Sequence, residues 1–111
     1  MTEQQLKSLI SSYDNIQLDD RSSEQVSIYS MGDEIMAVVK NASQPVQVSL
    51  RCDPNLAKLL CDKYESVLPS HHLNKRRFVT ILLTGQLSDD EIRDQVRHAY
   101  EETSQLLRRQ N

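Results

Sequence analysis

The stretch that decides the fold is FVTILLTGQLSDDEIRDQVRHAYEETSQLLRR, residues 78–109. The run from Phe78 to Leu83 is dense in large and β-branched side chains, which predicts a strand inside a sheet rather than at its edge. Ser88 and Glu91 then have the spacing of a capping box, and apolar residues recur at helical intervals after them. The expected helix has about 20 residues and is about 30 Å long, so it should cross the whole domain.

A second strand and helix precede this stretch. Val46, Val48 and Leu50 alternate with polar residues, which predicts a strand with one buried face. Asp53 followed by Pro54 predicts the start of a helix, because the carboxylate can cap free amide groups and proline at the first helical position loses no useful donor. The apolar stripe expected of this helix consists of Leu56, Leu59, Leu60 and Tyr64.

The N-terminal part predicts one helix and three strands. Thr2 and Gln5 have capping-box spacing, and the apolar residues after them indicate a helix over about residues 3–13. Three short segments with alternating or β-rich apolar residues follow, and turn-rich stretches separate them. These segments are centred on residues 16–18, 26–28 and 35–39.

The expected fold is therefore α+β, with the element order α-β-β-β-β-α-β-α. Strands joined by short turns form antiparallel meanders, and helices then segregate to one face of the sheet. We expect a single-layer, mostly antiparallel, five-stranded sheet with the helices packed on one face. No linker or internal repeat divides the chain, so residues 1–111 are expected to form a single domain.

Composition excludes several classes of protein. No apolar run approaches the ~20 residues that a membrane span needs, and the N-terminus lacks a basic region followed by an apolar one. We therefore expect a cytoplasmic protein with no membrane partner. The two glycines of the chain exclude glycine-rich phosphate loops and nucleophile elbows. Cys52 and Cys61 lack the spacing of a zinc or redox motif, so they are expected to be reduced thiols, with a disulfide as the alternative.

No catalytic residue, metal ligand or cofactor is predicted from these patterns, and the expected protein is not an enzyme. A nucleophilic cysteine would need a histidine placed beside it, and the sequence gives no sign of that geometry. The adjacent His71 and His72 point to opposite sides of an extended chain, so they do not chelate one metal ion easily.

Charge is distributed unevenly along the chain. Thirteen basic and sixteen acidic residues give a net charge of -3, but residues 66–88 contain no acid at all. Lys75, Arg76 and Arg77 lie inside this acid-free window, with His71 and His72 just before them. This asymmetry predicts a local positive potential despite the acidic total.

The candidate site is this basic loop, extended by one arginine from the preceding strand. Its residues are Arg51, His71, His72, Asn74, Lys75, Arg76 and Arg77. Guanidinium groups offer forked donors to phosphate, and lysine offers a mobile point charge. The alternative interpretation is a solvated turn, in which Asn74 holds the backbone through its side chain. Strand alternation would also send Arg76 and Arg77 to opposite faces.

Two segments resemble a signature of the MmcQ/YjbR-like family. The first is Leu50-Arg51-Cys52-Asp53-Pro54 followed by Leu56-Ala57, and the second is Pro69-Ser70-His71-His72-Leu73-Asn74-Lys75. Thr80, Gly85 and a final amphipathic helix with Tyr100 extend the resemblance. It implies an α/β sandwich related to the frataxin-like fold, in a bacterial family whose members are often labelled DNA-binding.

Two functional hypotheses follow from the sequence. The first is weak, non-specific contact with DNA or another polyanion through the loop 71–77, because nothing in the pattern places side chains on base edges. The second is a non-enzymatic adaptor that binds a protein partner through an exposed sheet face or a helix groove. The negative total charge and the lack of a second basic cluster favour the adaptor. No oligomeric state is predicted.

Overall fold

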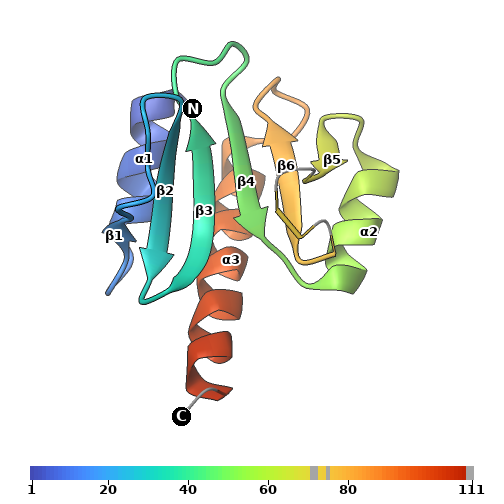
Figure 1. Cartoon of the computed structure of the whole chain (residues 1–111). Helices are drawn as coiled ribbons and strands as arrows, with labels where there is room; N and C mark the ends of the chain where they lie inside the picture. The colour runs from blue at the N-terminus through green and yellow to red at the C-terminus, as the bar shows by residue number, and fades with distance from the viewer. Residues whose placement is uncertain (71–72, 75, 110–111) are drawn as a thin grey trace.

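The computed structural model describes residues 1–70, 73–74 and 76–109. Within these residues the chain forms three helices and six strands (Figure 1). The helices are α1 (Glu3–Ser11), α2 (Pro54–Lys63) and α3 (Asp89–Arg109). The strands are β1 (Gln17–Leu18), β2 (Val26–Met31), β3 (Glu34–Lys40), β4 (Gln47–Arg51), β5 (Val67–Pro69) and β6 (Phe78–Leu82).

All the strands of the described residues belong to one antiparallel sheet with the order β1-β2-β3-β4-β6-β5. The first four strands are neighbours in chain order, as the predicted meander requires. β6 pairs with β4 and is covered on its other edge by β5, so the strand of residues 78–82 lies inside the sheet as predicted. The α+β class and the antiparallel sheet are confirmed.

The prediction of five strands was wrong, because β5 was not recognised. β5 has three residues, and its register places Val67 opposite Ile81 and Pro69 opposite Val79. Pro69 ends this strand, and proline cannot donate a ladder hydrogen bond. At the last position of an edge strand that donor is not needed, so the proline is tolerated there.

Local capping signals set the helix starts. The Thr2 hydroxyl accepts from the Gln5 amide, and the Gln5 side chain accepts from the Thr2 amide. Ser88 and Glu91 form the same reciprocal pair at the start of α3. The Asp53 carboxylate accepts from the amides of Asn55 and Leu56 at the start of α2. Free amides at a helix start are stabilised by such acceptors, so these three starts were readable from sequence.

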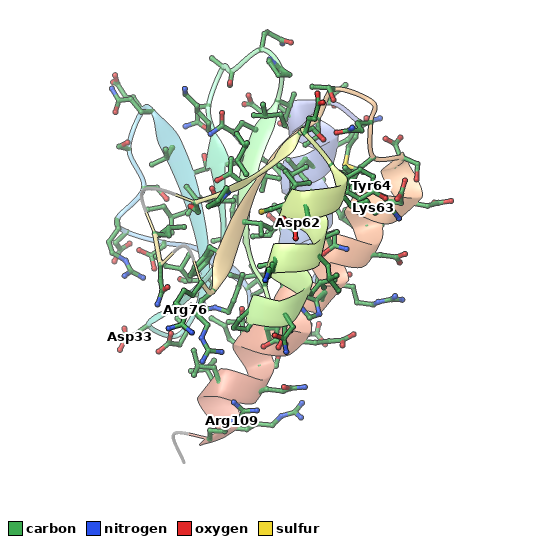
Figure 2. All side chains as sticks on the ribbon, turned by 90° about the vertical axis from the view of Figure 1, so that its right-hand side faces the viewer. Asp33, Asp62, Lys63, Tyr64, Arg76 and Arg109 are labelled. Carbon is green, nitrogen blue, oxygen red and sulfur yellow. The ribbon has the colours of Figure 1, made fainter. Side chains whose placement is uncertain are left out.

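The core lies between the sheet and the helices. Figure 2 shows the helices on one side of the strands, and α3 runs along the sheet against β3 and β4. One face of α3 is buried there through Ile92, Val96, Ala99 and Thr103. Alternate strand residues meet that face, and they are Val39, Val48, Leu50, Val79 and Ile81.

None of the helices of the described residues is long and apolar enough to cross a membrane.

Helix α2 buries a narrower stripe than its sequence predicts. It lies beside β5 and β6 and buries Ala57 and Leu60, whereas Leu59 is 66% exposed. The expectation that Leu59 faces the core was therefore wrong. Ala57 and Leu60 lie on the buried face of α2, and Leu59 lies on the face that is exposed to solvent.

Candidate functional site

The turn before β6 is held by Asn74. The Asn74 side-chain oxygen accepts from the Arg76 amide at 3.0 Å, and its backbone carbonyl accepts from the Arg77 amide at 2.9 Å. Asparagine commonly closes a turn in this way. Asn74 therefore has the structural role that the alternative interpretation gave it. His71, His72 and Lys75 of the predicted site lie outside the described residues.

The two described arginines of the loop do not share a surface. Both side chains are exposed, but Arg76 lines a groove beside α2 with Lys58, Cys61 and Asp62. Arg77 instead lies on the side of the loop that meets α3. The loop is thus not one continuous cationic patch across the described residues.

Arg51 is fixed at the end of β4. Its guanidinium donates to the Ile35 carbonyl at 2.8 Å, lies 3.4 Å from the Glu34 carboxylate and stacks 4.6 Å above the centre of the Phe78 ring. Burial lowers the pKa of Arg51; Glu34 opposes this shift and the positive charge of Arg77 adds to it. An arginine remains protonated under such conditions. The Arg51 side chain is therefore charged and held in place by its contacts, unlike a mobile surface side chain.

Arg51 and Arg77 meet Arg109 at a small cleft below the sheet. We call it the arginine cleft and define it by Arg51, Cys52, Arg77, Glu102, Leu106 and Arg109, which enclose about 250 Å³. Figure 1 shows α3 continuing past the lower ends of the strands, and Figure 2 shows Arg109 at that end of the helix. Three arginines against one glutamate leave an excess of two positive charges among the described residues of the lining.

Sequence reasoning missed Arg109 and Glu102 as members of this cleft. The basic residues of the last helical turn were assigned to the helix dipole, whose negative end favours them. Glu102, Leu106 and Arg109 are spaced i, i+4 and i+7, so they share one face of α3. That shared face was a readable signal, but what lies opposite it depends on tertiary structure.

Cys52 and His98 tie the cleft to its surroundings. The Cys52 amide donates to the Arg77 carbonyl at 2.7 Å, which joins the end of β4 to the turn before β6. Nε2 of His98 accepts from the Asp53 amide at 3.1 Å and lies 3.8 Å from Glu102. His98 therefore links α3 to the cap of α2. The described residues contain no group of three or more His, Cys, Asp or Glu arranged to hold a metal ion.

Burial keeps the Cys52 thiol protonated at neutral pH. It raises the pKa of Cys52 to about 12, and the negative charges of Asp53 and Glu102 add to the shift. The thiolate is the nucleophilic form of cysteine. Both cysteines are free, and Cys52 is buried in the lining of the arginine cleft.

The comparisons with known proteins identify the family. Residues 12–102 match the family model YjbR. The chain belongs to the YjbR family. It is 39% identical over 75 residues to a protein of Escherichia coli K12 described as "Uncharacterized protein YjbR", and equally so to its counterpart in Escherichia coli O157:H7. The match covers 68% of this chain and 64% of each relative, which is less than two thirds of their length.

Solved structures share the fold of this YjbR-family chain at low sequence identity. A crystal structure of a Deinococcus radiodurans protein with a DUF419 domain has a TM-score of 0.79 at 22% identity, covering 89% of this chain and 75% of that one. A crystal structure of a Pseudomonas syringae protein has a TM-score of 0.76 at 20% identity, covering 93% and 99%. These likenesses support the architecture, including the sheet that brings Arg51 next to the turn at residue 77.

The first motif of the family resemblance lines the arginine cleft through Arg51 and Cys52, and Asn74 of the second motif bonds to Arg77 of the lining. Register pairs Arg51 with Phe78, and the Cys52–Arg77 hydrogen bond fastens the first motif to the residue that follows the second motif and its turn. The Asp53-Pro54 pair starts α2, and Asn74 closes the turn. The described residues of the two motifs therefore have structural roles around the cleft. Among them, Arg51 also contributes a positive charge to the lining.

Proposed function

We propose that this chain binds the phosphate backbone of nucleic acid through the arginine cleft. The supporting observation is the convergence of Arg51, Arg77 and Arg109 from three separate segments on one lining, whose described residues include a single carboxylate. Guanidinium groups donate in pairs to phosphate oxygens, which makes such a convergence suited to phosphate. The proposed site therefore includes Arg77 of the loop 71–77, together with Arg51 and Arg109, instead of the whole loop.

The geometry favours weak and non-specific binding. A cleft of about 250 Å³ is smaller than the pockets that enclose whole small molecules, so it suits the phosphate groups of a backbone rather than a nucleotide base. Phosphate contacts position a protein on nucleic acid but carry no sequence information. Arg51 is held by Phe78 and Glu34, so Arg77 and Arg109 are the cations left to move toward a ligand.

The first prediction concerns the salt dependence of binding. If about three phosphates are engaged, the logarithm of affinity for a random-sequence duplex should fall against the logarithm of salt with a slope near -2.7. The double variant Arg77→Ala, Arg109→Ala should weaken binding at low salt and flatten that slope by about 1.8. Fluorescence anisotropy across a salt series, with single-stranded DNA in parallel, measures both quantities.

A matched control separates the cleft from net charge. The double variant Arg93→Ala, Arg97→Ala removes two positive charges, as the Arg77, Arg109 variant does. Both of its arginines lie on the exposed side of α3 and pair with acids on that helix. That variant should bind DNA nearly as the unmodified chain does, and Arg76→Ala should do the same. An equal loss in the Arg93, Arg97 variant, or no binding by the unmodified chain at low salt, would rule out the proposal.

A further inference from the structure

A groove separates α2 from the first turns of α3. It encloses about 610 Å³ and is lined by Leu56, Leu59, Leu60, Asp62, Lys63, Tyr64, Leu87, Glu91, Asp94 and Gln95, which we call the α2–α3 groove. Figure 2 shows Lys63 and Tyr64 at the end of α2 that lies beside the start of α3. The Tyr64 hydroxyl donates to Glu91 at 2.8 Å, so one end of the groove is closed by a contact between the helices. It shares no residue with the arginine cleft.

The floor of the groove is apolar and incompletely covered. Leu60 and Leu87 are buried, Leu56 is half-buried, and Leu59 is 66% exposed. Leu56, Leu59 and Lys63 follow i, i+3, i+7 spacing, so they form a stripe along α2, of which Leu59 and Lys63 are exposed and Leu56 is partly packed against the core. Leu56 packs against the core with part of its surface, whereas Leu59 leaves most of its apolar surface uncovered. An exposed apolar stripe with a polar rim is typical of an interaction site.

The rim of the groove is acidic. Asp62, Glu91 and Asp94 contribute three carboxylates against the single ammonium of Lys63. The Ser88 amide and the Tyr64 hydroxyl hold the pKa of Glu91 below its usual value, so this carboxylate is charged at neutral pH. Asp94 lies 3.2 Å from Arg97, an exposed pair, and Arg97 also lies 3.8 Å from Glu101. Arg97 therefore keeps Glu101 as a partner when Asp94 binds another cation.

We infer that the α2–α3 groove binds a basic amphipathic helix of a partner protein. Leucine-like side chains of that helix would cover Leu56 and Leu59, and its lysines or arginines would meet the acidic rim. This is the recognition mode in which an amphipathic helix lays its apolar face into a groove. α2 has ten residues and is about 15 Å long, so a helix of about ten residues matches its length.

Two other occupants fit the groove less well. Both walls are helices, whose backbone groups are bonded within each helix, so an added strand finds no sheet edge to pair with. Nucleic acid is repelled by the carboxylates of the rim. The inference does not depend on the phosphate-binding proposal, because the two sites differ in lining, charge and ligand.

The test uses a synthetic probe of the stated chemistry. A fluorescein-labelled helical peptide carries leucines at i, i+3, i+4 and i+7 and lysines elsewhere, and a control peptide replaces every lysine by glutamate. The lysine peptide should bind the full chain saturably in the micromolar range, and the glutamate peptide should bind at least tenfold more weakly. Leu59→Glu should weaken lysine-peptide binding at least tenfold, because it removes the main uncovered apolar contact.

Control variants make the result specific to the groove. Leu18→Glu alters a leucine of similar exposure, 61%, in β1, and should leave affinity within twofold of the unmodified chain. Asp62→Asn with Asp94→Asn should weaken binding several-fold and reduce its salt dependence, whereas Asp90→Asn, whose residue is outside the lining, should not. Circular dichroism melts check that each variant folds, as expected for exposed positions.

Three outcomes would overturn the inference. The first is no saturable binding of the lysine peptide, and the second is equal binding of the two peptides. The third is equal loss of affinity in Leu59→Glu and Leu18→Glu. Sedimentation of the chain alone adds a further check: a dimer that Leu59→Glu dissociates would assign the groove to a second copy of this chain and contradict a separate basic partner.

Discussion

Replacing Ile81 by alanine should lower the free energy of unfolding by about 3 to 4 kcal/mol. Ile81 has an exposed fraction of 0% and lies in β6, opposite Val48 of β4 and Val67 of β5. Truncation removes buried methyl groups and leaves a cavity between two strands and the helix layer, and the rigid surroundings collapse only in part. Urea unfolding followed by circular dichroism measures the difference from the midpoint and slope.

Leu68→Ala is the matched control for this prediction. Leu68 belongs to the neighbouring strand β5, but its side chain is 42% exposed on the face opposite the helices. Its truncation should cost less than about 1 kcal/mol, because most of the removed surface was already in contact with water. If Ile81→Ala cost no more than Leu68→Ala, β6 would not be the central strand of the core.

The parts of the fold that sequence predicted are those set by local signals. The periodicity of residues 78–109 and the capping pairs at Thr2, Asp53 and Ser88 act within a few residues of each element. Those signals are independent of distant neighbours, so they survive in the folded protein. β5 has no such signal, because three residues ending in proline form a strand only when β6 is already present to pair with them.

The candidate site was predictable only in part for the same reason. Acid-free composition located the loop, but strand alternation does not account for the separation of Arg76 and Arg77, because both lie in the turn before β6. Arg109 lies beside Arg77 because α3 is long enough to pass the end of the sheet. The sequence predicted the length of this helix but not that its last turn lies opposite the end of β4. The exposed stripe of α2 was misassigned to the core, since helical periodicity identifies an apolar face but not the surface that covers it.

In the folded protein, Cys52 should react with iodoacetamide at pH 8 at least about a thousandfold more slowly than in the unfolded chain. The pKa of Cys52 is raised from 9.0 to about 12, so the reactive thiolate fraction at this pH falls by about that factor. The 2% exposure of Cys52 slows the reaction further. The Cys61→Ser variant leaves Cys52 as the only thiol, and mass spectrometry follows alkylation with and without denaturant.

The stability of the folded protein should also depend on pH through Cys52. A raised pKa favours the neutral thiol in the folded state, so its stabilising contribution is full below pH 9 and is lost as the pH rises toward 12. Cys52→Ala should therefore lose less stability than the unmodified chain between those values. Cys61 is half-buried, and burial also raises its pKa, so it should react before Cys52 does. The prediction would be contradicted by a folded-state alkylation rate of Cys52 within tenfold of the unfolded rate. Such a rate would mean that Arg51 and Arg77 activate the thiol. The arginine cleft would then be a candidate for nucleophilic chemistry instead of phosphate binding.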